Sequence, residues 1–482
     1  MSEPPLAHSA AQQGMVSPLS RVMRRSPIAC APDTPVRDAI AIMRAHHIGS
    51  IVIIDGAGAP LGIFTLRDLV DRALADDAAL GKPISTVMTG DLYTLGPAAT
   101  AYDAALAMLR HGIRHVLVVE DGRLVGIVSE KDLFSLQRVS MRQLAGAIKD
   151  ARDIDALVTF AQEIREHARK MLDQGVAPEP LTQFIASLND LLTQRLIDLE
   201  FRGMQGDPAR YCWIALGSEG RYEQTFHTDQ DNAIIFHDTG NAEAVRTRLL
   251  PFAERVNRSL DRCGFPLCKG NIMAGNPRWC LSLEEWHGRF ASWINTGEPQ
   301  ALLHGAIFFD FRALHGDASL ADSLRRWLMG HAKQTPRFLH QMAENALHNR
   351  PPLGMLRDFV TSEAEGHPNT IDLKLNGATL FTDAARIYGL AAGIAHTNTC
   401  ERLRGFGRAR SLDAREVNAW VDSFLYIQML RLKQQHREHM RGAPLSNRLD
   451  PDELNLLERS TLKEALKHAR SLQSRLALDY RL

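Results

Sequence analysis

The chain of 482 residues lacks net charge and long apolar runs. Lys+Arg and Asp+Glu both total 56, so bulk electrostatic binding of nucleic acid or of an anionic membrane is not expected. No stretch approaches the roughly 18–20 apolar residues that span a bilayer. The segment 1–14 is short, polar and rich in Pro and Ala, and it lacks the basic and then apolar pattern of a secretory signal. We expect a disordered tail there and a cytoplasmic protein.

Cysteine is scarce and forms no recognisable motif. There are six cysteines and no C-x-x-C pair, and Cys263, Cys268 and Cys280 have the wrong spacing for a zinc site. This usage favours free thiols in a reducing cytoplasm. The 19 histidines include no H-E-x-x-H pattern, so they point to no metalloprotease-type site.

What the chain does have is ample apolar content and an internal repeat. Its composition, 45% hydrophobic and 23% charged, suits several folded domains. Val22-Met23 recurs as Val87-Met88 and Gly62 as Gly126, offsets of 65 and 64 residues, which indicates a tandem duplication. In each copy, helical spacing is followed by two short apolar runs joined by an Asp-Gly turn, which predicts a helix and then a β-hairpin.

Both copies end on the same pattern, a Gly, then a Ser or Thr, then an Asp. The residues are Gly62, Thr65 and Asp68 in the first copy and Gly126, Ser129 and Asp132 in the second. This pattern resembles the CBS domain, and the pair resembles a Bateman module. The resemblance implies that the Gly admits a nucleotide, the hydroxyl caps a helix and meets phosphate, and the Asp holds ribose. We expect an adenine nucleotide or a related ligand; the alternative is a dimerisation scaffold in which the hydroxyls are only helix caps.

Residues 139–205 have helical periodicity, broken near Gly175 and the Pro178/Pro180 pair. The pattern predicts two amphipathic helices packed as a hairpin, with no chemistry of its own.

The most informative stretch runs from Tyr211 to Phe236. An apolar run of strand length ends at Gly217-Ser218, a polar turn follows, and Thr228-Asp229-Gln230-Asp231 leads into a second apolar run. The predicted order is strand, short helix, Asp-x-Asp, strand.

Each polar residue of this stretch has a place in phosphoryl transfer. Gly217 permits close backbone approach, Ser218 offers a hydroxyl and amides to a triphosphate, and Arg221 can reach the same phosphates. Asp229 and Asp231 are two residues apart, so their carboxylates face one side and can share Mg²⁺ with phosphate oxygens. Either motif alone is weak, but their combination predicts a nucleotidyltransferase site.

The segment resembles the G-S-x-G-R…T-D-x-D signature of the DNA-polymerase-beta-like nucleotidyltransferases, in the branch related to PII uridylyltransferase. The segments at 268–279, 306–317, 372–386 and 399–403 are similar to this branch too. The resemblance implies Mg²⁺ and transfer of UMP or AMP from an NTP to a hydroxyl of a PII-like protein or a small molecule. It also implies a homodimer. No phosphohydrolase domain follows, so a built-in removal activity is not indicated.

Enzymes of this kind usually have a third carboxylate on a later strand. The best-matching later strand, Gly270–Met273, has no acid, so Asp310 is the candidate catalytic residue. The alternative is that Asp310 is buried in an ion pair with Arg312 or a nearby Lys.

The remaining chain is helical in pattern, including a helix expected over Leu353–Glu363, and by the same resemblance it is a substrate-binding domain. Lys374, Asp383, Arg386 and Arg402 are candidates for lining a cleft, or for ordinary interhelical salt bridges. We therefore expect an α+β multidomain chain. Its parts are a tail (1–14), a tandem CBS pair (15–138), a helical connector (139–205), a nucleotidyltransferase domain (206–330) and a helical domain (331–482). Two other functions stay open: a nucleotide-sensing protein that has lost catalysis, and an interaction scaffold.

Overall fold

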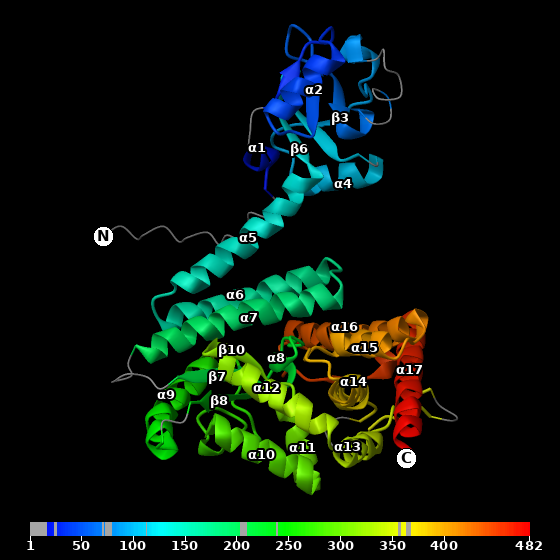
Figure 1. The fold of residues 1–482 in the computed structure, drawn as a ribbon. Coiled ribbons are helices and arrows are strands. Elements are labelled where there is room, and N and C mark those ends of the chain that lie inside the picture. Colours follow the sequence, from blue (N-terminus) through cyan, green and yellow to red (C-terminus); the bar gives the residue numbers. More distant parts are fainter. Residues whose placement is uncertain are drawn as a thin grey trace. The chain divides into compact units, whose positions relative to one another are not determined.

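The structure, a computed structural model, divides into two compact units, residues 1–146 and 147–482 (Figure 1). It describes residues 17–23, 27–69, 72, 80–111, 113–202, 210–237, 240–354, 358–362 and 368–482. The predicted tail, 1–14, lies outside these residues. Within them, no helix combines the length and the apolar character that a membrane crossing requires.

The first unit contains two copies of a three-stranded sheet with helices. Strand orders are β1-β2-β3 and β4-β5-β6; in each sheet the first pair is parallel and the second antiparallel. The elements are α1 (Leu19–Val22), β1 (Ala29–Cys30), α2 (Val36–Ala45), β2 (Ser50–Ile54), β3 (Pro60–Thr65), α3 (Leu66–Asp68), a 3₁₀ turn (Ile84–Thr86), β4 (Thr94–Leu95), α4 (Ala101–His111), β5 (His115–Glu120), β6 (Arg123–Ser129) and α5 (Glu130–Asp150). The predicted hairpins are confirmed. Asp121 and Gly122 both have positive φ, as a two-residue hairpin turn of this hand requires.

The two copies exchange their leading segments. Leu19 and Val22, which precede the first copy, are buried in the core of the second, whereas Ile84 and Val87, which precede the second copy, are buried in the core of the first. Neither copy therefore has a complete core by itself, and the pair folds as one unit.

The second unit is built on a four-stranded sheet of order β10-β7-β8-β9. Every residue of β7 and β8 is buried, which explains their continuous apolar sequences. The elements around the sheet are α6 (Ile154–Asp173), α7 (Pro178–Phe201), β7 (Tyr211–Ala215), α8 (Gly217–Gly220), β8 (Asn232–Phe236), α9 (Ala242–Arg262), a 3₁₀ turn (Pro277–Trp279), β9 (Cys280–Ser282), α10 (Leu283–Thr296), α11 (Pro299–Phe308), β10 (Arg312–Gly316) and α12 (Ala318–Lys333). The segment 270–273 is not the predicted strand: it is a loop in which the Ile272 carbonyl accepts from the Asn232 amide, and β9 is the strand beside β8.

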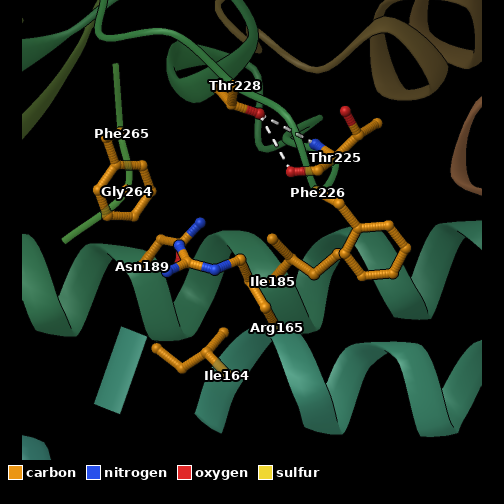
Figure 2. A pocket seen from close by; sticks show the side chains of 9 residues that line it. All are labelled: Ile164, Arg165, Ile185, Asn189, Thr225, Phe226, Thr228, Gly264 and Phe265. Carbon is orange, nitrogen blue, oxygen red and sulfur yellow. Dashed lines mark hydrogen bonds between the residues drawn. The ribbon is translucent and has the colours of Figure 1, made fainter. Parts of the chain in front are cut away.

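The predicted connector hairpin, α6 and α7, is part of this unit rather than a free-standing linker. Arg312 Nη2 pairs with Asp190 Oδ1 on α7 at 2.6 Å, and Gln194 Nε2 donates to the Leu314 carbonyl. Figure 2 shows Arg165 and Asn189 of the two helices facing the loop that contains Thr225 and Thr228. The gap between them is about 10 Å³, room for one water molecule at most, so this contact is packing and not a ligand site.

The C-terminal helices pack beside the sheet and share one continuous core with it (Figure 1). They are α13 (Pro336–His348), β11 (Ile371–Asp372), a π-helical turn (Lys374–Ala378), α14 (Thr379–Ala392), α15 (Thr399–Ala409), α16 (Ala414–Met440), β12 (Arg448–Leu449), a 3₁₀ turn (Pro451–Glu453) and α17 (Leu456–Tyr480). The helix expected over Leu353–Glu363 is wrong in its described part, where the backbone of Leu353 forms a bridge with that of Phe359.

Candidate active site

The turn after β7 places Gly217 against the carboxylate of Asp231. Gly217 has φ +54°, and a Cβ at this position would lie 2.6 Å from Asp231 Oδ2. The Leu216 amide donates to the Asp231 carbonyl at 2.9 Å, which fixes the two segments together. The predicted order of strand, Gly-Ser turn and Asp-x-Asp therefore forms one local site. Within the part of the chain that the structure describes, the Ser218 hydroxyl has no hydrogen-bond partner, so it can serve a ligand.

Asp229 and Asp231 precede β8 and lie near a common cation. Asp229 is exposed, Gln230 is turned inward, where its amide donates to the Asn257 and Phe265 carbonyls, and Asp231 is half-buried. Burial raises the pKa of Asp231, Lys374 opposes this, and Asp229 adds to the rise. Lys374 interacts electrostatically with both carboxylates. The alternation agrees with the predicted common side for the two acids.

This pair fits the ligands that Mg²⁺ uses. Mg²⁺ takes one or two carboxylates together with substrate phosphate oxygens, and it would relieve the mutual repulsion that raises the pKa of Asp231. Among the described residues, His, Cys, Asp and Glu side chains make no cluster of three or more suited to a metal. A metal held by Asp229 and Asp231 therefore depends on substrate oxygens for its remaining ligands.

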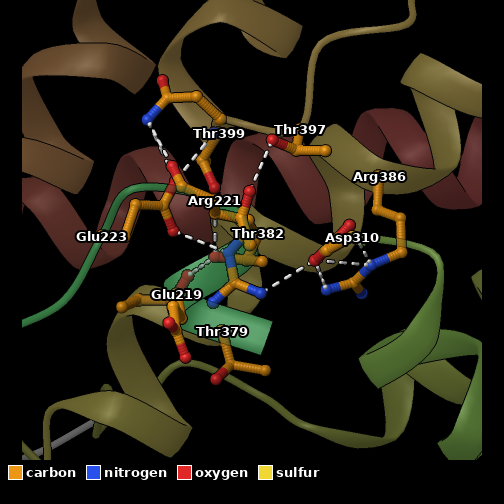
Figure 3. A network of polar contacts seen from close by, with 12 residues as sticks. Glu219, Arg221, Glu223, Asp310, Thr379, Thr382, Arg386, Thr397 and Thr399 are labelled. Carbon is orange, nitrogen blue, oxygen red and sulfur yellow. Dashed lines mark hydrogen bonds and ion pairs between the residues drawn. The ribbon is translucent and has the colours of Figure 1, made fainter. Parts of the chain in front are cut away.

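Arg221, the predicted phosphate ligand, is held by two carboxylates (Figure 3). Its Nε lies 2.7 Å from Glu223 Oε2, and its Nη1 lies 2.8 Å from Asp310 Oδ2. These contacts fix the guanidinium at the end of α8, so Arg221 helps to position the turn that carries Gly217 and Ser218. A contact with phosphate stays a prediction.

Asp310 is the centre of a buried cluster of arginines. Besides Arg221, its carboxylate binds Arg386 Nη2 at 2.7 Å and Arg402 Nη1 at 2.5 Å, and the Asp310 side chain is fully buried. Burial alone would raise the pKa of Asp310, but the charges of Arg386, Arg402 and Arg221 hold it well below its usual range. The cluster joins the sheet to α14 and α15.

This geometry favours a structural role for Asp310 and not the predicted catalytic role. Both oxygens are occupied by guanidinium groups, so neither is free to bind a metal or to take a proton from an acceptor. Its partners also differ from the predicted ones, because Arg312 pairs with Asp190 instead. Arg386 and Arg402 are buried in ion pairs with Asp310, and Arg386 also pairs with Asp383 of its own helix, α14, at 2.6 Å.

The loop between α14 and α15, with the first residue of α15, binds the segment Gly220–Glu223. Thr397 Oγ1 donates to the Gly220 carbonyl at 2.7 Å, Asn398 Nδ2 donates to the Arg221 carbonyl at 3.0 Å, and the Thr399 amide donates to Glu223 Oε1 at 2.7 Å (Figure 3). The C-terminal helices therefore complete the local structure of the turn.

Glu219 is a buried acid that the sequence reasoning missed. Burial raises the pKa of Glu219 to about 8, Asp190 adds to the rise, and Arg312 opposes it. Acids placed so close to a candidate site are often functional. Its position could have indicated a role, because Glu219 is the variable residue of the G-S-x-G-R motif, between Ser218 and Gly220.

In the described part of the first unit, two clefts each take lining residues from both copies of the repeat. A cleft of about 390 Å³ is lined by Thr65 and Asp68, and one of about 660 Å³ by Ser129 and Asp132, sizes that suit a small ligand. Arg114 and His115 line both clefts. The predicted hydroxyl and carboxylate residues are therefore brought together, copy by copy.

The hydroxyls act first as helix caps. Thr65 Oγ1 donates to Asp68 Oδ2 at 2.7 Å, and Ser129 Oγ donates to Asp132 Oδ2 at 2.6 Å. In the first copy the amides of both residues complete a capping box. Contacts of these residues with phosphate or ribose stay predictions.

The expected role of Gly62 and Gly126 needs correction. A Cβ at Gly62 would lie 2.3 Å from Met88 Sδ, and one at Gly126 would lie 1.6 Å from Met23 Sδ. Neither glycine lines the cleft of its copy. The physical reason for glycine is the close packing of the exchanged leading segments, not the approach of a nucleotide.

Comparison with known families agrees with this architecture. Residues 19–75 and 84–138 match the family "CBS domain", residues 162–300 match "Putative nucleotidyltransferase DUF294", and residues 336–480 match "Putative nucleotidyltransferase substrate binding domain". The chain is a CBS-pair protein with a nucleotidyltransferase-family domain. In this family assignment the candidate site at Gly217–Asp231 lies within the transferase domain, and Lys374, Arg386 and Arg402 lie in the substrate-binding domain.

Individual relatives match the CBS pair. The CBS domain-containing protein YhcV of Bacillus subtilis is 32% identical over 103 residues, 21% of this chain and 73% of that protein. An uncharacterized 17.7 kDa protein of Acidianus ambivalens is 32% identical over 120 residues, 25% of this chain and 72% of its own. The solved CBS-domain containing protein ATU1752 of Agrobacterium tumefaciens is 31% identical, with a TM-score of 0.24, and covers 25% of this chain and 98% of its own.

Proposed function

We propose that this protein transfers a nucleoside monophosphate, UMP or AMP, from a Mg²⁺-bound NTP to a hydroxyl of a protein or small-molecule acceptor. The observation that carries the proposal is the contact of Gly217 with Asp231, with Asp229 two residues away. It supports a site in which the two carboxylates lie beside the Gly217-Ser218 turn, so that a phosphate bound at this turn can share a metal with them.

Each residue has a defined part in this chemistry. Asp229 and Asp231 would hold Mg²⁺, which supplies charge stabilisation to the phosphoryl oxygens as the bond to the leaving pyrophosphate breaks. Ser218 and the amides near Gly217 orient the triphosphate. Arg221, held by Glu223 and Asp310, keeps this turn in place.

The test is transfer of label from an α-³²P-labelled NTP. The full chain is incubated with Mg²⁺, each NTP in turn and a cell lysate, and label in protein and in small molecules is followed. We expect label with the wild type and none with the Asp229→Asn, Asp231→Asn double variant, because losing metal-bound charge stabilisation costs several kcal/mol of barrier. Label transfer within twofold of wild type in the double variant would exclude the assignment.

A CBS-pair ligand is the second part of the proposal. We propose that the clefts at Asp68 and Asp132 bind an adenine nucleotide that regulates the transferase. The size of the clefts supports this, as do Arg67 and Arg114, cations that line the smaller one. Calorimetry of the full chain with AMP, ADP, ATP and cyclic dinucleotides tests it, with Asp68→Ala, Asp132→Ala as the variant expected to bind at least tenfold more weakly. If no nucleotide gives a binding heat that the Asp68→Ala, Asp132→Ala variant loses, the scaffold alternative is favoured.

A further inference from the structure

Arg431 is a buried arginine without an acidic partner. It lies on α16 and is 5% exposed; its Nη1 donates to Gln428 Oε1 at 2.5 Å and its Nε to Asn447 Oδ1 at 2.9 Å, both neutral amides. Among the described residues no carboxylate lies within salt-bridge distance of it. The comparably buried Arg386 and Arg402 both pair with Asp310, as buried cations usually pair with an acid. Asp372 and Glu223 act on Arg431 only electrostatically, so it is a buried cation whose hydrogen bonds go to neutral groups and not to a carboxylate.

Lys374 is a second cation of this kind. It is exposed at the first position of the π-helical turn Lys374–Ala378, and π-helical turns are frequent at functional sites. Its ammonium has no hydrogen bond or ion pair within the described ranges. It interacts electrostatically with Asp231 and Asp229, and with Arg431.

Asn447 links Arg431 and the backbone next to Lys374 to the loop before Asp229. Its carbonyl accepts from the amide of Leu373, the neighbour of Lys374, at 2.9 Å, and its Oδ1 accepts from Arg431 and from Gln435 Nε2 at 3.2 Å. Gln435 Oε1 in turn accepts from the amide of His227, two residues before Asp229. The two cations therefore belong to the same hydrogen-bonded framework as the Asp229–Asp231 pair.

We propose that Lys374 and Arg431 bind the triphosphate of the donor nucleotide. This inference rests on the proposed function and adds to it that the C-terminal domain supplies the phosphate-binding cations of the site. A triphosphate carries enough negative charge to bind Mg²⁺ and two further cations at once, whereas Arg221 already has its charge balanced by Glu223 and Asp310.

The test is calorimetry of the full chain with Mg²⁺ and two probes, a non-hydrolysable NTP and inorganic tripolyphosphate. We expect Lys374→Gln to weaken binding of both probes at least tenfold, and Lys374→Arg to restore most of it. Arg431→Gln should act in the same direction. The matched control is Lys433→Gln, which removes a cation two residues along α16 that pairs with Glu458 at 2.9 Å, and it should stay within twofold of wild type.

Each outcome decides between the proposals. Lys374 is exposed, so its variant is expected to fold, and thermal melting identifies any loss of structure in the Arg431 variant. If Lys374→Gln leaves both affinities within twofold of wild type, the inference is wrong. It is also wrong if only the KM of the acceptor rises, because the cations then bind the acceptor. Tripolyphosphate binding that needs Lys374, without NTP binding, would support the anion site and overturn the proposed function; a wild type that binds neither probe would overturn both.

Discussion

Gly217 packs against the carboxylate of Asp231, because a Cβ at Gly217 would lie only 2.6 Å from Asp231 Oδ2. The contact ties the end of β7 to the start of β8. It places the turn beside the carboxylate that is proposed to bind metal.

Gly217→Ala should therefore damage function more than stability. The added Cβ must displace Asp231, and a displacement of about 1 Å at a reacting centre commonly costs about 100-fold in rate. The φ of +54° adds strain of roughly 1–2 kcal/mol for a residue with a side chain. Transfer of labelled NMP and urea unfolding measure the two effects.

Gly393→Ala is the matched control for backbone strain. Gly393 has φ +73°, and a Cβ there would meet nothing within 4 Å. It should lose stability to a similar degree and keep its activity. Equal activities of the two variants would show that the contact with Asp231 does not matter.

Glu219 should make the protein less stable as the pH rises. Its pKa is raised to about 8, so between about pH 4.5 and pH 8 the folded chain holds a proton that the unfolded chain releases. Stability from this group is complete below its ordinary pKa and falls as the pH increases through that window, by an amount on the order of a few kcal/mol. Glu219→Gln should abolish the loss.

Urea unfolding of the wild type and Glu219→Gln at pH 5, 7 and 9 measures this difference. The exposed carboxylate of Glu284 on α10 offers a control, because Glu284→Gln should keep the wild-type profile. Parallel pH profiles for wild type and Glu219→Gln would mean that Glu219 is ionised in the folded protein throughout.

The Asp310→Asn variant should unfold more readily than wild type, because the substitution leaves the guanidinium groups of three arginines without their shared anion. Breaking a buried ion pair on one side typically costs about 3–5 kcal/mol. Asp358 also binds two cations, Arg459 and Lys463, but its side chain is 40% exposed, so Asp358→Asn is expected to have little effect on urea unfolding. A small effect of Asp310→Asn would show that the cluster is not what joins the sheet to α14 and α15.

The local elements of the site could be predicted from the sequence, but its long-range partners could not. The strands, the Gly217-Ser218 turn and the alternation of Asp229 and Asp231 follow from periodicity over a few residues. The contact of Asp310 with Arg386 and Arg402 spans 76 and 92 positions, and no local pattern encodes which of many arginines meets one buried acid. The apolar run around Asp310 predicts a buried acid, but it does not predict the arginines that surround it.

The repeat shows the same limit on a smaller scale. Its helices and hairpins follow from the sequence, because two copies of one pattern reinforce each other. The exchange of leading segments does not, since Met88 packs on Gly62 and Met23 on Gly126 only once both copies are folded. Spacing along the chain does not distinguish a glycine that admits a ligand from one that admits a methionine.

Coupling between the CBS pair and the transferase is the last prediction. Helix α5, Glu130–Asp150, continues the chain directly from the last CBS residues, and α6 and α7 follow it. Helix α7 contacts the loop before Asp229 through the 3.1 Å hydrogen bond from Asn189 to Gln224. A ligand that favours one state of the CBS pair can therefore bias the active-site loop, provided that it binds the two states unequally.

The expected coupling is roughly 1–3 kcal/mol, or about 5- to 150-fold in affinity. Linkage makes it measurable without the acceptor: an NTP at Gly217–Asp231 must change the affinity of the CBS ligand by the same factor as the CBS ligand changes that of the NTP. Calorimetric titration of each ligand with and without the other gives both factors, and Asn189→Ala should reduce both if the loop contact transmits the effect. Independent affinities in the wild type, together with unchanged turnover on adding the CBS ligand, would show that the two domains share a chain but not a regulatory equilibrium.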